Sequence, residues 1–421
     1  MHSLHLNLKI TAIATLAALL APQAWAETSP YYIGASVDLS RVNNLTRLQD
    51  QPQSSTDSVA ATTLQAGFDQ PVSRQRFYGD ASVTSNRYRD SGQYNNIAYS
   101  LKGGWDWATV ERLSGNVYVN ARQSLGDFSL YSGDVVQREK NVENTRQFGA
   151  TARIGLVTQW TGEVSWKHER LNYSAIDFAY ANYRQNTATG SIVYRHSNQL
   201  GTGLSYSRVQ GEYPTTPLGT NPQTYAPDNY SGPDYGGFVE FTPSGNAGLT
   251  LRLNRSTRTH DGAKNRDFQG LTGSLYTHWA PTGKTKLYAS FWRDTGEDAT
   301  FLNLNNIPGG SVGDYSSVSN NYRFALEYQV TSHITLTGNW THTDRDLSNA
   351  VTQGTASTIL TGKDHTNRLG LAVQYQPTRT VTLTCHAARD SRTTSEPIAP
   401  SLSYPYTGSS YGCSGQVMLR P

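Results

Sequence analysis

The feature that most constrains this chain is an alternation of apolar and polar residues with a period of two. It recurs in about eighteen segments, joined by short turns or by longer polar loops. In one segment, Leu369, Leu371 and Val373 alternate with Gly370 and Ala372. This period places successive side chains on opposite faces of a β-strand, one suited to lipid and the other to water. The pattern predicts an all-β fold: a single transmembrane, antiparallel, up-and-down β-barrel of about 18 strands.

The connections between these segments fall into two classes. Short ones carry an aromatic residue, then Pro or Thr, then a small polar residue, as in residues 279–282 and 375–378. We interpret them as periplasmic turns with a girdle residue just inside the membrane. Long ones are rich in Asn, Ser, Gly, Asp and Pro and are predicted extracellular loops; they are residues 43–57, 213–234, 296–317, 347–363 and 393–409. An even number of strands places both termini on the periplasmic side.

The first 26 residues have the features of a signal peptide. Lys9 precedes an apolar run over residues 10–21, and Ala24-Trp25-Ala26 is a small-x-small cleavage site. The run is too short to cross a bilayer as a helix. We therefore expect a signal peptide at residues 1–26, a barrel over residues 27–421, and a mature protein in the cell outer membrane of a Gram-negative bacterium.

The composition agrees with a barrel that has a wet interior. Only 36% of the residues are hydrophobic, and the 26 Tyr residues far outnumber the 11 Phe residues. A soluble globule of this length normally needs more Leu and Ile to fill its core, whereas a barrel needs apolar groups only on its outside. The net charge of +3 and the absence of like-charge runs predict no nucleic-acid partner.

The two cysteines fall in the last two predicted strands. Cys385 is in phase with Leu383 and Cys413 with Val417, so both are predicted to face lipid. A hairpin near Pro400 would bring them opposite each other, at a separation that a disulfide can bridge. Two unpaired cysteines acting as small apolar residues are the alternative.

Projecting the alternation inward gives the chemistry of the lumen. Basic residues outnumber inward acids such as Asp38, Glu163 and Glu327. Basic rings in a pore favour anions, but the same residues could instead pair with acids across strands and stiffen the wall. The inward basic residues are Lys102, Arg122, Arg153, Lys167, Arg252, Arg258, Lys286, Arg323, Arg345 and Arg368.

Aromatic residues also share the inward phase. Their flat rings can stack on the apolar faces of sugar rings while neighbouring polar side chains bind hydroxyl groups. Ordinary space filling, or a place in the aromatic girdle, is the alternative. These residues are Tyr78, Tyr88, Tyr118, Tyr276, Tyr288 and Trp292.

The sequence gives little support to an enzyme. Candidate pairs are His260 with Asp261, His342 with Asp344, and Asp364 with His365, each near a predicted loop. No nucleophile elbow, phosphate-binding glycine loop or His pair at a metal-binding spacing accompanies them. We therefore predict no catalytic residues, no cofactor and no metal site.

Two short motifs resemble a known family. Residues 31–39 read YYIGASVDL and residues 41–48 read RVNNLTRL; residues 103–107 (GGWDW) and 112–115 (RLSG) extend the likeness. The chain resembles the β-barrel porins associated with exopolysaccharide biosynthesis operons, and departs from them at the second position of the loop motif. The resemblance implies secretion of an exopolysaccharide across the outer membrane. It marks Asn44 and Arg47 as a signature without a known role.

Two functions remain open. The first is an export conduit for an exopolysaccharide, with an anionic polymer favoured by the inward basic residues. The second is a general diffusion porin for small solutes, or a structural barrel with a plugged lumen. The expected partners are outer-membrane lipid, a polysaccharide substrate, a periplasmic export or synthesis protein, and the barrel assembly machinery.

Overall fold

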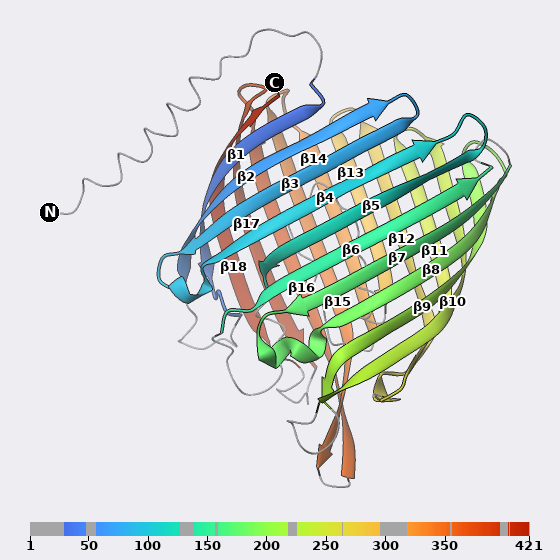
Figure 1. Cartoon of the computed structure of the whole chain (residues 1–421). Coiled ribbons are helices and arrows are strands. Elements are labelled where there is room, and N and C mark those ends of the chain that lie inside the picture. Colours follow the sequence, from blue (N-terminus) through green and yellow to red (C-terminus); the bar gives the residue numbers. More distant parts are fainter. Residues whose placement is uncertain are drawn as a thin grey trace.

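The computed structural model describes residues 29–47, 56–126, 139–155, 159–217, 225–262, 264–294, 318–353, 356–395, 403 and 405–420. Their eighteen strands form one sheet, and β1 (Tyr31–Asn43) pairs with both β2 (Asp57–Val72) and β18 (Tyr406–Leu419). The sheet therefore closes on itself as a barrel (Figure 1). Every neighbouring pair is antiparallel, as in Ser36 opposite Gln416 at the closing seam. The predicted 18-stranded up-and-down barrel is confirmed.

The remaining strands follow in chain order around the barrel. They are β3 (Gln75–Tyr88), β4 (Asn96–Ala108), β5 (Leu113–Leu125), β6 (Val142–Ile154), β7 (Trp160–Tyr173), β8 (Tyr183–Arg195), β9 (Leu200–Pro217), β10 (Tyr225–Ser244), β11 (Ala247–His260), β12 (Phe268–Thr282), β13 (Thr285–Asp294), β14 (Val318–Gln329), β15 (Ile334–Gln353), β16 (Ala356–Tyr375) and β17 (Val381–Thr394). Three short 3₁₀ helices lie in connections: η1 (Gly92–Tyr94), η2 (Ile176–Ala181) and η3 (Lys264–Arg266). Within the described ranges, no helix is both long and apolar enough to cross a membrane.

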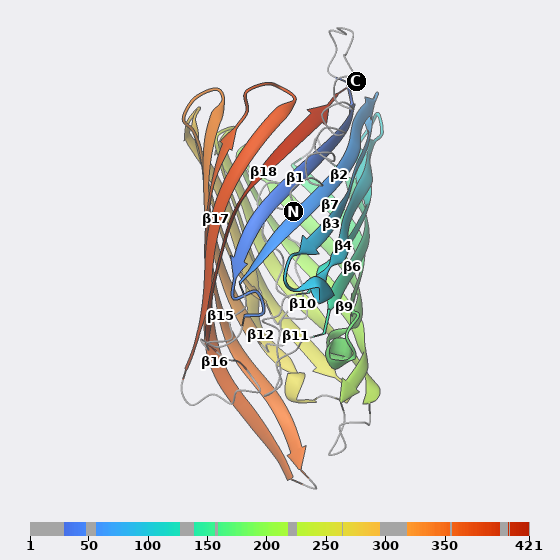
Figure 2. The same ribbon diagram turned by 90° about the vertical axis from the view of Figure 1, so that its left-hand side faces the viewer.

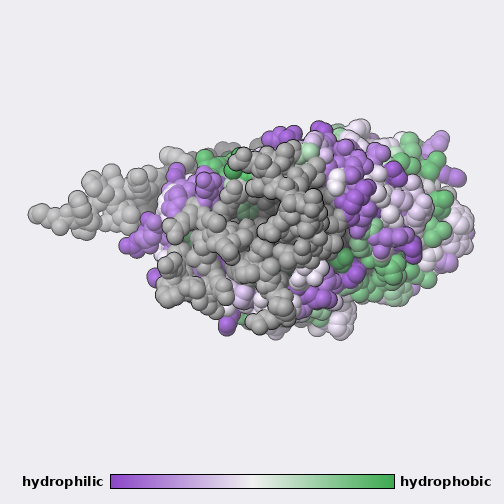
Figure 3. Space-filling model, turned by 90° about the horizontal axis from the view of Figure 1, so that it is seen from below, coloured by the Kyte–Doolittle hydropathy of each residue, from purple (hydrophilic) through white to green (hydrophobic). Residues whose placement is uncertain are grey.

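The outer face of the barrel is apolar because the apolar residues of each alternating segment are the exposed ones, whereas the residues between them point inward. Along β1, Ile33 and Leu39 are 57% and 63% exposed, whereas Gly34 between them is buried. Aromatic side chains such as Trp279 and Tyr375 are exposed beside the short turns. Hydrophobic patches on the flank of the barrel are visible in the end-on view of Figure 3. A closed sheet with this exterior is an outer-membrane-type β-barrel.

The short turns gather at one end of the barrel, as predicted. Residues 283–284 join β12 to β13, and residues 245–246 join β10 to β11. β1 begins and β18 ends at this same end (Figure 2). The predicted signal peptide lies outside the described residues.

Two of the predicted loops are wrong. Most of residues 213–234 and 347–363 belongs to strands, because β9 and β10 and above all β15 and β16 continue far past the predicted strand ends. The β15–β16 hairpin projects beyond its neighbours in Figure 2. The backbone ladder of a hairpin holds without an apolar face once the strands leave lipid, so the alternation stops before the strands do. The predicted loop at 296–317 lies outside the described residues.

The two cysteines are joined by a disulfide between β17 and β18. Cys385 and Cys413 are direct partners in the ladder, with their Cα atoms 4.0 Å apart. Both side chains occupy the outward phase of their strands, alongside Leu383 and Val417. The bridge therefore lies on the outer face of the wall.

Candidate functional site: the inner wall of the barrel

The structure places the predicted lumen residues on one face of the sheet. Each lies in the phase opposite to the exposed apolar residues of its own strand, as Arg153 does between Ala152 and Ile154. The basic residues on this inner face are Lys102, Arg122, Arg153, Lys167, Arg252, Arg258, Lys286, Arg323, Arg345 and Arg368. The aromatic residues on it are Tyr78, Tyr88, Tyr118, Tyr276, Tyr288 and Trp292. Their part in passing a solute stays a prediction.

Many of the inward basic residues pair with carboxylates across strands. On this wall, ion pairs join Arg153 to Glu163 at 2.5 Å, Lys286 to Glu327 at 2.8 Å, Arg258 to Asp234 at 2.7 Å and Arg252 to Glu240 at 3.8 Å. The inner charges therefore largely neutralise one another along β6–β7 and β10–β14. This geometry favours the cross-strand pairing alternative for these residues.

Three inward arginines differ from the others. In the described part of the chain, no carboxylate lies within ion-pair distance of Arg122, Arg323 or Arg368. Arg323 and Arg368 share a row of the sheet, with Thr341 between them as the ladder partner of both. Two strand spacings put their backbones roughly 10 Å apart. The Nε atom of Arg323 is buried and lacks a hydrogen-bond partner among the described residues.

A row of alternating tyrosine and glycine residues runs across the inner face of β3 to β6. Tyr78, Gly104, Tyr118 and Gly149 are successive ladder partners on the four strands. Each ring covers the next glycine: a Cβ at Gly104 would collide with the hydroxyl end of Tyr78, and one at Gly149 would lie 2.5 Å from Tyr118 Cε1. The rings therefore lie against the wall rather than across the lumen. The guanidinium of Arg76 lies 5.2 Å from the centroid of Tyr78 and donates to the carboxylates of Asp69 and Asp106.

An aromatic cluster on the loop side was missed from the sequence. Residues from β7 to β10 pack together with η2, and Tyr183 and Tyr230 donate hydrogen bonds to Glu169 (2.6 Å) and Gln185 (2.7 Å). The buried members are Leu171, Tyr173, Ala175, Phe178, Tyr183, Val209, Tyr213 and Tyr230. Apolar residues in the inward phase at the loop ends of β7 and β9 are the signal that could have indicated it. This cluster therefore forms a small packed core at the loop ends of β7 to β10.

The signature residues Asn44 and Arg47 tie the connection after β1 to the far side of the seam. Both have left-handed backbones, with φ of 51° and 55°. Asn44 Nδ2 donates to the Thr407 carbonyl at 2.8 Å, and Arg47 Nε lies 2.6 Å from the carboxylate of Asp390 on β17. The motif therefore has a structural role here: it anchors this connection at the mouth of the barrel.

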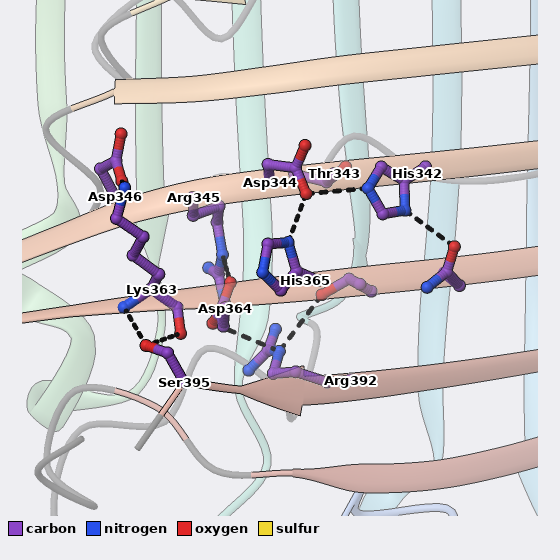
Figure 4. A network of polar contacts seen from close by, with 12 residues as sticks. His342, Thr343, Asp344, Arg345, Asp346, Lys363, Asp364, His365, Arg392 and Ser395 are labelled. Carbon is purple, nitrogen blue, oxygen red and sulfur yellow. Dashed lines mark hydrogen bonds and ion pairs between the residues drawn. The ribbon is translucent and has the colours of Figure 1, made fainter. Parts of the chain in front are cut away.

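A buried polar network joins the loop ends of β15, β16 and β17 to Ser403. Asp364 on β16 accepts a hydrogen bond from Arg345, and Arg392 lies 3.6 Å away (Figure 4). Ser403 donates a further hydrogen bond to Asp364 at 2.5 Å. Asp364 is fully buried. Arg345, predicted as a lumen cation, is thus neutralised within a packed network.

Of the three candidate enzyme pairs, His342 and Asp344 lie 2.8 Å apart, whereas the members of the other two pairs do not meet. His260 is fully buried and pairs with Asp228 at 2.7 Å rather than with its neighbour Asp261. Asp364 and His365 lie on opposite faces of β16, since Asp364 is on the inner face with Arg345.

His365 instead meets His342 and Asp344 on the outer face, and the three could hold a metal ion. The sequence analysis did not bring these three residues together, because it considered spacing along one segment and the third residue comes from the next strand.

No family model and no curated protein matches the chain. Among solved structures it is similar to OpdQ of Pseudomonas aeruginosa, with 11% identity and a TM-score of 0.44 over 92% of this chain and 99% of that one. The outer membrane protein opdK of the same organism shares 11% identity and a TM-score of 0.43 over the same shares. The siderophore receptor PirA of Acinetobacter baumannii shares 8% identity and a TM-score of 0.42, covering 94% and 81%. Likeness at this level says nothing about function, and the fold assignment rests on the closed sheet itself.

Proposed function

We propose that this protein is an outer-membrane channel that exports an exopolysaccharide. A closed barrel with a polar inner wall suits a hydrated polymer, and the opening motifs resemble porins of exopolysaccharide operons. Export also calls for a periplasmic protein that delivers the polymer and for the barrel assembly machinery that inserts the channel.

The Tyr–Gly row on β3 to β6 is the observation that carries this proposal. Tyr78 and Tyr118 lie against glycines of the next strand, so they add aromatic surface to the wall without filling the lumen. Aromatic rings bind the apolar face of a sugar ring without fixing it at one position, and each ring has a hydroxyl group for a polar contact. A wall of this kind suits a chain of sugars that must keep sliding.

Deletion of the gene, followed by complementation, tests the proposal. Sugar analysis of the deletion strain should find polymer in the periplasm and little on the cell surface. The wild-type gene should restore export, and the Tyr78→Leu/Tyr118→Leu variant should restore it only in part at equal barrel abundance. Tyr206→Leu is the matched control because Tyr206 lies exposed on the outer face. Unchanged surface polymer in the deletion strain would refute the export function.

A general diffusion porin is the second candidate, and the cross-strand ion pairs favour it. Pairs such as Arg153–Glu163 and Lys286–Glu327 leave much of the wall polar but nearly neutral, as a channel with little solute preference requires. This candidate predicts unchanged surface polymer in the deletion strain together with slower entry of small sugars, measured by liposome swelling with the purified protein.

A further inference from the structure

The outer surface of the barrel carries a cluster of two histidines and one aspartate. His342 and Asp344 lie on β15, and His365 is the ladder partner of Asp344 on β16. All three are in the outward phase of their strands, and their side chains are 23%, 30% and 45% exposed, in chain order. One ligand atom from each lies within 4.8 Å of the others. Figure 4 shows both imidazoles pointing at the same carboxylate.

The cluster lies just beyond the apolar band of the barrel. Outward positions on β16 are apolar up to Leu369 and polar from Asn367, and on β15 they change between Trp340 and His342. This level corresponds to the lipid headgroups on the loop side of the membrane. An ion from solution can therefore reach the cluster without entering hydrocarbon or the lumen.

The hydrogen bonds around His342 determine which of its nitrogens faces the carboxylate. Nδ1 lies 2.8 Å from Asn367 Oδ1, a contact that turns Nε2 toward the carboxylate. Nε2 lies 2.8 Å from Asp344 Oδ1. His365 Nδ1 contacts the same oxygen, so one nitrogen of each imidazole faces the Asp344 carboxylate. The three ligand atoms lie close enough together for one ion to contact all of them.

From this geometry, we infer that His342, Asp344 and His365 form a binding site for a divalent transition-metal ion, with zinc as the reference ion. Two imidazoles and one carboxylate are ligands that zinc accepts, and imidazole nitrogens disfavour magnesium and calcium. Asn367 contacts the Nδ1 atom of His342, the nitrogen that does not face the ion. Residues that hydrogen-bond to a ligating histidine in this way fix its orientation in many metal sites. Water completes the coordination. The bound ion fastens β15 to β16 at the base of the projecting hairpin.

Titration of the purified barrel with zinc chloride tests the site. The mature protein, without a histidine tag, is titrated in detergent at pH 7.5 by calorimetry. We expect one saturable zinc ion per chain, and at least about tenfold weaker affinity for His342→Gln, His365→Gln and Asp344→Asn. Zinc should also raise the midpoint of thermal unfolding of the wild type more than that of His342→Gln/His365→Gln.

His168→Gln is the matched control. His168 also lies on the outer face and contacts an asparagine on the next strand, with Nδ1 2.9 Å from Asn186 Oδ1, but no carboxylate or second histidine completes the set in the described structure. This variant should bind zinc like the wild type. Equal zinc affinity of the wild type and the His342→Gln/His365→Gln variant would overturn the site, and so would an absence of saturable binding. In either case the two histidines would be hydrogen-bond partners of Asp344 and no more.

Discussion

At the scale of single residues, the inner wall combines neutralised charges with a few that have no counter-charge among the residues that the structure describes. Arg323 and Arg368 are the clearest case, because Asp390, the ladder partner of Arg368, pairs with Arg47 instead. A charge without a partner acts on a passing ion with its full field, whereas a paired one acts mainly as a dipole. Selectivity of the proposed channel should therefore depend on very few positions.

This contrast gives a prediction for ion selectivity. Arg323→Gln/Arg368→Gln should lower the preference for chloride over potassium, measured from the reversal potential across a planar bilayer in a salt gradient. Arg153→Gln/Glu163→Gln is the control, because it removes a charge pair and leaves the net charge unchanged. An unchanged reversal potential for the double arginine variant would exclude these residues as an anion filter.

The Tyr–Gly row gives a second prediction at this scale. Gly104→Ala should force the Tyr78 ring off the wall, since a Cβ there would lie 2.5 Å from its Cζ atom. We expect a loss of about 1–3 kcal/mol in the free energy of unfolding, as in other overpacked sites, measured by urea titration in lipid vesicles. Gly190→Ala is the control, because a Cβ at Gly190 meets nothing within 4 Å. If Gly104→Ala and Gly190→Ala lost the same free energy of unfolding, the position of the Tyr78 ring would not depend on a glycine at 104.

At the scale of strands and hairpins, the last hairpin is the most strongly fastened element. The disulfide links β17 to β18 across a separation of 28 residues. Replacing both cysteines with serine frees that length of chain in the unfolded state, which should cost about 3–4 kcal/mol of stability. The midpoint of urea unfolding should fall equally in Cys385→Ser/Cys413→Ser and in reduced wild type. Ala387→Ser, on the same outer face, should leave it nearly unchanged. If the urea midpoint of the wild type were the same before and after reduction, the disulfide would not stabilise the barrel.

Strands were predictable from the sequence wherever one of their faces contacts lipid, because that face requires apolar side chains. Leu369, Leu371 and Val373 indicate β16 because a polar residue there would face hydrocarbon. Beyond the bilayer, both faces can be polar, so the upper halves of β15 and β16 look like loops in the sequence. Whether a side chain points inward or outward also depends only on its position within its own strand, so the inward residues were predictable from the sequence. Ion pairs such as Arg153–Glu163 and the His342–Asp344–His365 cluster depend on the register between strands, which no single segment contains.

At the scale of the whole molecule, the barrel exists only if the first strand meets the last. The seam pairs β1 with β18 along most of their length, and Arg47 and Asn44 add contacts across it at the loop end. Without this pairing, β1 and β18 would each leave a row of backbone groups unpaired in lipid, where every such group costs several kcal/mol. The register of the whole sheet must therefore bring β1 and β18 into pairing.

The register at the seam can be tested by cross-linking. In a Cys385→Ser/Cys413→Ser background, Ser36→Cys with Gln416→Cys places two thiols at directly opposed positions on the inner face. These should form a disulfide on mild oxidation and link the two ends of the chain, so that the heat-denatured protein migrates as a near-circular chain on a non-reducing gel. Ser36→Cys with Met418→Cys is displaced by two positions and should stay linear. Cross-linking of the displaced pair instead would mean that the barrel closes with a different shear.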